Sequence, residues 1–369
     1  MSKSKKVSIV KILFRALGAL WDKFILWIYA TFFALFLTIF LSLRRYRMSH
    51  NNGIAGRGRL KVLDNPDIPD HEFFKPGREF DIRVRHGSAT FLDDAMNVIR
   101  SCSIKFADHY IKSPLDLELN SGHFSVFWSA LSFLKFAGGR AEKYGVDWVD
   151  YNRKYPDGSL GAQVGSRRMA TSFHNLRYHS KTPFLFIPIS GVKHYCKYKV
   201  RPYEDISEIG QDPNPDPLDA SNQRVLKHDT RGKNYLKNEY ISLVKKGPVK
   251  YKLQLQLRLA NEDDDPEIFN NMRPWDDKQF PWKDIAEFEV KEIMDWKEST
   301  MTTYSMKNMP KSLSIIPAKS IYDYNSLNYL RKKSHIARVV RVWALKLFGM
   351  VPPIPDNDVR NIRVWSKPI

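Results

Sequence analysis

Cysteine is scarce in this chain: 369 residues contain two, and Cys102 and Cys196 stand far apart. Two isolated cysteines exclude a disulfide scaffold and a zinc site built from paired CxxC motifs. The sequence also lacks a Walker A motif, a GxSxG elbow and an HExxH pair, the short signatures of P-loop nucleotide hydrolases, serine hydrolases and zinc proteases. No Asn-x-Ser/Thr sequon occurs, which favours a cytosolic location for the globular part.

Acidic residues are also few relative to basic ones. The chain has 40 Asp and Glu against 59 Lys and Arg, a formal net charge of +19 and a pI of about 9.7. Such an excess suits nucleic acid, anionic lipid or an acidic ligand. Much of it lies beside one long apolar run and near the C-terminus, and no nucleic-acid-binding motif is present, so we predict a membrane surface and no nucleic acid as partner.

The long apolar run spans residues 24–43 and carries no charge. About 20 such residues in a helix cross the ~30 Å hydrocarbon core of a bilayer. We therefore predict a basic amphipathic segment at residues 1–23 followed by a single transmembrane helix at 24–43. A cleavable signal peptide is the alternative, but arginines follow the run where a cleavage site of small residues is expected. Equal numbers of basic residues precede and follow the run, so the distribution of positive charge does not determine the orientation of the helix. We expect a single-pass protein with a cytosolic domain.

Residues 44–333 predict one domain, because strand-like segments recur without a long linker. The clearest is Tyr251–Leu259, where apolar and polar residues alternate strictly, as in a strand with one buried face. Similar short segments occur at 80–86, 103–106, 184–189, 195–200 and 286–290. We predict an α+β fold, an antiparallel β-barrel with flanking helices. Residues 124–136 suit a strand or a helix. Residues 334–369 predict a basic amphipathic helix and a tail, with the helix packed on the domain or forming a second membrane contact.

A set of short motifs begins at Arg47 to Gly53 and continues in a fixed order to residue 310. Together these motifs resemble the catalase superfamily, and its short members of the allene oxide synthase type in particular. Arg47 to Gly53 resembles the distal R-x-x-H-x-x-G segment, with a further glycine at Gly58. Later segments at 94–106, 115–120, 178–184, 195–198, 275–281 and 308–310 resemble the family's subsequent motifs. The resemblance covers roughly residues 47 to 330 and implies haem b as cofactor and a peroxide as substrate.

The resemblance also implies roles for individual residues. His50 matches the distal base that moves a proton between the peroxide oxygens. Asn120 matches the amide that holds the peroxide, and Phe133 the ring that stacks near the haem. Arg47 and Arg100 are expected to pair with the haem propionates or to buffer the iron-bound anion. His50 follows the apolar run by seven residues, within about 25 Å of chain, so a lipid hydroperoxide could enter from the membrane.

The proximal half of the family pattern is missing. The R-x-x-x-Y motif that supplies a tyrosinate to the iron falls on Asp323 and Leu327. A shifted register would offer Tyr324 or Tyr329 as the iron ligand. Three hypotheses follow: a haem enzyme acting on lipid hydroperoxides, a haem-less pseudoenzyme whose barrel binds a lipid or partner protein at the membrane, and a purely structural membrane-surface protein.

Overall fold

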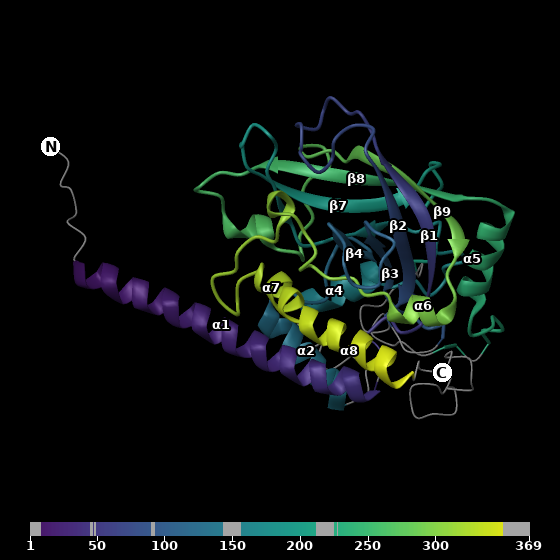
Figure 1. Ribbon diagram of the computed structural model, residues 1–369. Helices are drawn as coiled ribbons and strands as arrows, with labels where there is room; N and C mark the ends of the chain where they lie inside the picture. The colour runs from purple at the N-terminus through teal and green to yellow at the C-terminus, as the bar shows by residue number, and fades with distance from the viewer. Residues whose placement is uncertain are drawn as a thin grey trace.

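The central element of the fold is an antiparallel sheet that closes on itself as a barrel (Figure 1). The computed structural model describes residues 9–44, 47, 49–89, 93–142, 156–211, 225–226 and 228–349. The strand order is β5-β4-β3-β2-β1-β9-β8-β7-β6, and the pairing of β5 with β7 closes the ring. Residues 1–8 of the predicted N-terminal segment and 350–369 of the predicted tail lie outside the described residues.

The strands run over β1 (Gly53–Val62), β2 (Glu79–Ser88), β3 (Arg100–Lys105), β4 (Asp116–Ser121), β5 (Tyr178–His179), β6 (Phe184–Phe186), β7 (His194–Pro202), β8 (Val249–Leu259) and β9 (Lys283–Ile293). The helices are α1 (Ile9–Arg44), α2 (Ala130–Glu142), α4 (Pro156–Gly165), α5 (Tyr235–Lys246), α6 (Trp296–Met301), α7 (Ser326–Lys333) and α8 (His335–Phe348). Two short 3-10 turns, η2 (Pro266–Phe269) and η3 (Lys311–Leu313), lie between them. The predicted barrel with flanking helices is confirmed.

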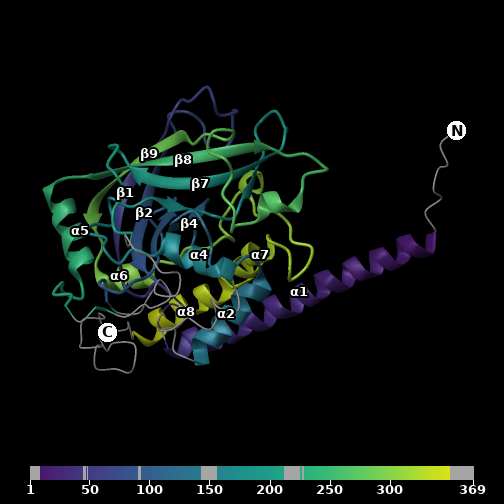
Figure 2. The ribbon, with the colours of Figure 1, turned by 180° about the vertical axis from the view of Figure 1, so that it is seen from behind.

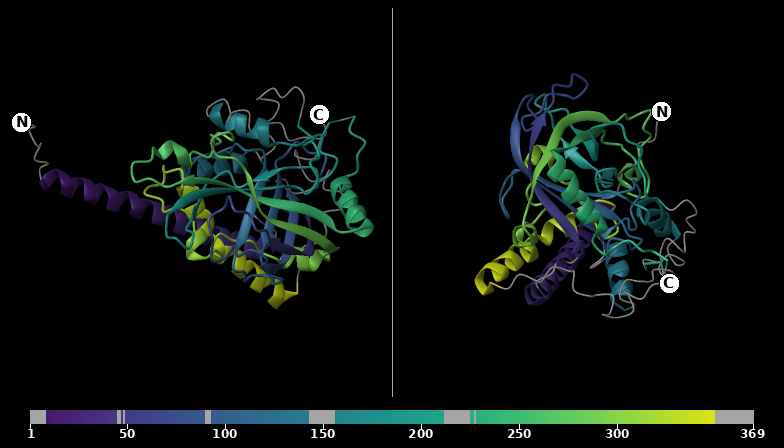
Figure 3. Two further views of the ribbon diagram at one scale, coloured as in Figure 1. Left: turned by 90° about the horizontal axis from the view of Figure 1, so that it is seen from above. Right: turned by 90° about the vertical axis from the view of Figure 1, so that its right-hand side faces the viewer.

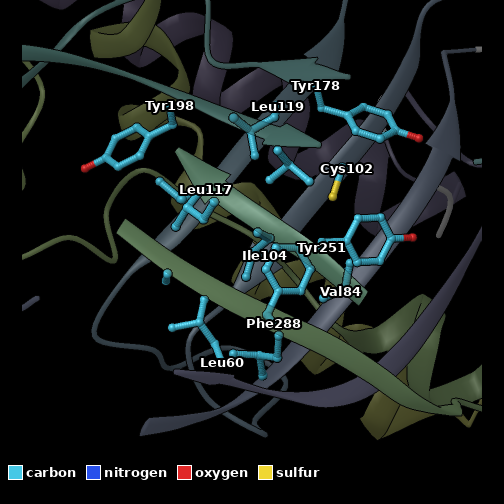
Figure 4. Close-up of a cluster of buried hydrophobic side chains, with 14 of the residues drawn as sticks. Leu60, Val84, Cys102, Ile104, Leu117, Leu119, Tyr178, Tyr198, Tyr251 and Phe288 are labelled. Atoms are coloured by element: carbon cyan, nitrogen blue, oxygen red, sulfur yellow. The ribbon is translucent and has the colours of Figure 1, made fainter. Parts of the chain in front are cut away.

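Alternating apolar residues place one face of each strand inside the barrel. Tyr251, Leu253 and Leu255 of β8 are fully buried, and the matching residues of the other strands meet them in one core. Figure 4 shows this core, with side chains from β1, β2, β3, β4, β5, β7, β8 and β9 pointing toward one another. The alternation read from the sequence therefore predicted the inward face correctly, because only a barrel or a covered sheet buries every second residue.

The barrel interior is packed and holds its own polar groups. His86 is fully buried, and its Nε2 lies 3.0 Å from the hydroxyl of Tyr251, which in turn donates to Tyr240 at 3.1 Å. Burial lowers the pKa of His86 to about 3, so the ring is neutral. Both cysteines are buried in the same core. These contacts make the interior a packed core.

The N-terminal helix is continuous from Ile9 to Arg44, with no break near residue 23. Its stretch Ile12–Leu43 is long and apolar enough to cross a membrane, a test that a signal sequence or a core helix also passes. The C-terminal half of α1 lies along α7 and α8, and its N-terminal half projects away from the domain (Figures 1 and 2).

Helices α6, α7 and α8 lie together below the barrel as it is drawn in Figure 1. Arg57 of β1 pairs with Glu298 of α6, and Glu118 of β4 accepts hydrogen bonds from α7 and α8. The predicted amphipathic helix after residue 334 is α8, and it packs on the domain through Ala337, Val342 and Leu345. The ambiguous segment at 124–136 contains the start of a helix, α2.

Candidate functional site

The loop that joins α1 to β1 holds Arg47 and His50 in a fixed conformation. Asn51 bridges it: its Oδ1 accepts from the Arg47 amide at 2.6 Å, and its Nδ2 donates to the Arg47 carbonyl at 2.8 Å. His50 has φ +57°, a left-handed conformation unusual for a non-glycine residue, and its Nδ1 lies 2.9 Å from the Ser49 hydroxyl. Such a conformation persists where the surroundings enforce it, often at functional sites.

Three arginines from distant parts of the chain gather beside this loop. Arg47 donates to the carbonyls of Ser299 (2.9 Å) and Thr302. Arg85 of β2 donates to the carbonyl of Asn51 at 3.2 Å. Arg341 of α8 donates to the carbonyl of Thr300 at 2.9 Å, next to the Arg47 partners. We call Arg47, Arg85 and Arg341 the arginine cluster.

The arginine cluster gathers three positive charges, of which Arg85 and Arg341 are buried and Arg47 is half-buried. Arg85 is 4% exposed and Arg341 2%. Burial lowers the pKa of Arg47 to about 10 and lowers the pKa of Arg85 and Arg341 as well, with repulsion from Arg47 adding to the effect. Among the described residues neither Arg47 nor Arg85 forms an ion pair, and the Arg85 Nε has no hydrogen-bond partner. Because buried charge is costly without a counter-ion, the cluster is suited to an anion, and carboxylates match its fork geometry.

Asn120 and Arg100 lie together on the β3–β4 pair. Asn120 is opposite Ser101 in β3 and opposite His179 in β5, at the seam that closes the barrel. Arg100 is fully buried, and its guanidinium donates to Ser88 Oγ and to three carbonyls, those of Asp94, Met96 and Arg167. These bonds tie the loop after β2 to the barrel wall. The predicted propionate contact of Arg100 would compete with them.

Phe133 and Tyr329 lie in a different place, under α1. The Phe133 ring on α2 packs edge-on against Phe33 of α1, with ring centroids 5.6 Å apart. Tyr329 of α7 belongs to the same apolar cluster, and Lys333 lies over its ring at 6.0 Å. Burial raises the pKa of the Tyr329 phenol, which favours the neutral form.

Tyr324 lies elsewhere again. Its hydroxyl donates to Glu267, and its ring lines a cavity of about 290 Å³ together with Phe124, Trp128 and Arg273. Burial and the hydrogen bond to Glu267 raise its pKa to about 12. A tyrosinate ligand needs the opposite shift, from a nearby cation. The residues four positions before Tyr324 and Tyr329 are Ser320 and Asn325, and neither supplies a charge.

The haem that the family resemblance implies fits this chain at its propionates, but the chain offers no suitable tyrosine for its iron. The arginine cluster suits two propionates beside the loop that carries His50. Neither Tyr324 nor Tyr329 is set up as an iron ligand, since each phenol is held neutral and engaged in other packing. No group of three or more His, Cys, Asp or Glu side chains that could hold a metal ion occurs in the part of the chain the structure describes.

Two polar features of the outer wall of the barrel were not identified from the sequence. Glu118 of β4 accepts from Arg331 of α7 at 2.6 Å and from Arg338 of α8. Although burial raises its pKa, the two arginines lower it to about 2. Lys105 and Asp116 form an ion pair at 2.9 Å with both side chains fully buried. The alternating LDLELN segment was a signal of such outward carboxylates, but their partners lie in helices far along the chain.

A second cavity, of about 320 Å³, lies at the β5–β7 seam and is basic and aromatic. Its lining residues are His123, Arg177, His179, Lys181, Lys197, Lys199, Glu208, Gln256, Pro274, Trp275, Asp277 and Trp282. Burial lowers the pKa of Lys181 and of Lys197 to about 7. The Lys197 ammonium lies 4.7 Å from the Trp275 ring centre. The family-like segments at 195–198 and 275–281 meet here, which sequence order alone did not predict.

The chain resembles known proteins in sequence and in fold. A scan against protein-family models finds no match. Over 328 residues, 86% of the chain, it is 33% identical to the allene oxide synthase-lipoxygenase protein of Plexaura homomalla, spanning 30% of that protein. It is 28% identical to the linolenate 9R-lipoxygenase of Nostoc sp. over 332 residues, 85% of the chain and 41% of that protein. The chain therefore spans less than half the length of these curated relatives.

The fold matches solved catalases. Catalase A from Saccharomyces cerevisiae superposes with a TM-score of 0.59 at 13% identity, covering 78% of this chain and 61% of that one. A fungal catalase gives a TM-score of 0.58 at 15% identity, covering 81% and 62%. At such identities the likeness concerns the barrel and its flanking helices.

Proposed function

This chain is a catalase-like barrel protein homologous to the allene oxide synthase-lipoxygenase protein, and from that premise we propose that it acts on lipid hydroperoxides at a membrane. Both curated relatives are named for the chemistry of oxygenated fatty acids. The observation that carries the proposal is the arginine cluster beside the His50 loop. It is a buried cationic site with no carboxylate of this chain on Arg47 or Arg85 among the described residues.

In this proposal each residue of the site would have a separate role. Arg47, Arg85 and Arg341 hold the carboxylates of the ligand, which are the propionates of haem b. When bound, a haem supplies the redox-active iron for cleavage of a peroxide bond. His50, held by Ser49 and by the Asn51 bridge, moves a proton between the peroxide oxygens. We assign Asn120, which lies beside the seam of the barrel, the role of orienting the peroxide by a neutral hydrogen bond.

The test begins with the absorbance spectrum of the full chain expressed with ample haem. We expect a Soret band, which Arg85→Met weakens and Arg85→Lys partly restores. We also expect His50→Ala to lower fatty-acid hydroperoxide turnover at least tenfold while the spectrum and the melting temperature stay close to wild type. Arg59→Met, at an exposed arginine of β1, is the matched control and should change neither. Unchanged turnover in the His50 variant would refute its assigned role.

A second candidate function is a haem-less barrel that binds a lipid or a partner protein at the membrane. The placement of the tyrosines favours it, because Tyr324 is bonded to Glu267 and Tyr329 is packed under α1. Under this proposal the arginine cluster holds the carboxylate of the fatty acid itself. Absence of a Soret band, together with tight hydroperoxide binding that Arg85→Met abolishes, would support this function over the enzyme.

A further inference from the structure

Helix α1 docks on the domain along one stripe. Leu26, Ala30, Leu37 and Leu41 are buried against α2, α7 and α8, and their spacing of four and seven residues keeps them on one helix face. This docked stripe spans nearly the whole uncharged run at 24–43. The face of α1 that remains available there for another partner is the opposite one.

The opposite face of α1 is apolar and exposed. It carries large side chains with exposures from 55% to 76%: Phe32, Leu35, Phe36, Ile39 and Leu43. Helix α8 lies beside α1, and both helices lie on the same side of the barrel (Figures 1 and 3). It adds four more apolar side chains with exposures from 55% to 78%: Ile336, Trp343, Leu347 and Phe348. We call these nine residues the apolar platform.

A perpendicular crossing of the bilayer by α1 is hard to reconcile with this docking. The residues that contact α1, among them Leu330 and Ala337, would enter the hydrocarbon with it. Their neighbours Arg331 and Arg338, paired with Glu118, would follow into a medium where charge is expensive. A helix lying in the membrane plane avoids this cost, because only its free face enters the lipid.

Charge at the edge of the platform matches an anionic lipid surface. The Lys333 ammonium lies 5.9 Å from the ring centre of Trp27 on α1, and Lys346 is exposed beside Leu347 on α8. Lys23 is exposed on α1 where the helix leaves the domain. Lysines around an apolar face are the pattern of proteins that sit in the interface of bilayers containing anionic lipid.

We propose that α1 and α8 together form a monotopic membrane-binding face, with α1 lying in the plane of an anionic bilayer. This proposal rests on the proposed membrane location of the function and specifies its geometry. Large apolar side chains enter the acyl boundary while the barrel stays in water. The arginine cluster, which includes Arg341, then shares helix α8 with the membrane-facing side chains.

Vesicle flotation of the full chain tests the platform. We expect binding to vesicles of phosphatidylcholine with phosphatidylserine to exceed binding to phosphatidylcholine alone. The double variant Trp343→Glu, Leu347→Glu should reduce binding at least tenfold, because both side chains are exposed and unnecessary to the core. Ile189→Glu, at an apolar residue 67% exposed outside the platform, is the control. Wild-type binding by the double variant, or a stable dimer that hides the platform and does not float, would overturn the proposal.

Cysteine labelling decides between the in-plane and the crossing arrangement. Asp22→Cys places a thiol on the exposed part of α1, while Cys102 and Cys196 are buried and serve as an unreactive background. In sealed vesicles with the domain outside, an impermeant maleimide should label this thiol. Protection until detergent is added would show a crossing helix and refute the in-plane arrangement. Hydroperoxide turnover of the same proteins in detergent tests the proposed function independently, so the two can fail separately.

Discussion

At the residue scale, the unusual feature of this protein is how many cations it buries. The arginine cluster lies behind α8, and the cavity at the β5–β7 seam holds Lys181 and Lys197 within its walls. Burial disfavours the charged form of a lysine, so each of these ammonium groups loses its proton more readily than one in water. Such residues are maintained at a cost to stability, which marks both regions as candidates for function.

Lys197 gives a prediction with a defined pH window. Burial lowers its pKa to about 7 in the folded chain, from 10.5 in the unfolded chain. Between these values the unfolded state binds the extra proton, so this group's contribution to stability rises with pH. Lys197→Met should therefore raise the free energy of unfolding by about 1–3 kcal/mol near pH 7, with the gain shrinking toward pH 10.

Urea unfolding from pH 6.5 to 9.5 measures the effect. Lys193→Met is the matched control, at an exposed lysine just before the same strand. A constant difference between Lys197→Met and wild type across this range would contradict a titrating, buried Lys197.

At the element scale, the first strand is built around close approach to its neighbour. A Cβ on Gly58 would lie 1.7 Å from the Glu289 carbonyl oxygen, and one on Gly56 would lie 2.4 Å from Val290 Cγ1. The β1–β9 register shifts between Arg57 and Gly58, as at a bulge. Glycine is required here because any side chain would collide with β9.

Gly58→Val tests this directly. The added side chain must push β1 away from β9, so we expect a loss of at least about 3 kcal/mol in the free energy of unfolding, or failure to fold. Gly232→Ala is the control, because nothing lies within 4 Å of a Cβ at that position. Circular dichroism melts report both variants; a Gly58→Val melt within a degree or two of wild type would mean that β1 and β9 are not packed as described.

At the scale of the whole molecule, α1 is a structural part of the domain. Its buried stripe completes two apolar clusters, one with Ala130, Ile321 and Leu330 and one with Ala337. If α1 were only a membrane tether, its removal would not change the stability of the domain. The docked helix instead contributes buried side chains to the packing of α2, α7 and α8.

Deletion of residues 1–44 should therefore destabilise the domain. Losing the burial of Leu26, Leu37 and Leu41 costs on the order of 5 kcal/mol and exposes an apolar strip. We expect a lower melting temperature and self-association in size-exclusion chromatography with detergent present. A shorter deletion, of residues 1–23, keeps the docked stripe and is the control. Equal melting temperatures for both deletions would show that α1 does not stabilise the domain.

Much of the fold was predictable, and the candidate site only in part. Local signals such as the alternation in β8 predicted β2, β3, β6, β7, β8 and β9, but not β1, β4 or β5. The role of Tyr324 or Tyr329 stays a prediction that the packing of both phenols disfavours, and Arg85 and Arg341 were missed because no local pattern marks an arginine as buried.

The sequence by itself determined the strands, the apolar helix and the order of the family motifs, because each depends on residues close together in the chain. Only the tertiary structure decided which distant residues and elements contact one another. Arg47 donates to the Ser299 carbonyl, 252 residues away in the chain, and β5 closes the barrel by pairing with β7. The apolar run that the sequence predicted as a membrane span packs along α7 and α8. Such contacts depend on how the elements pack, and periodicity carries no information about a partner hundreds of residues away.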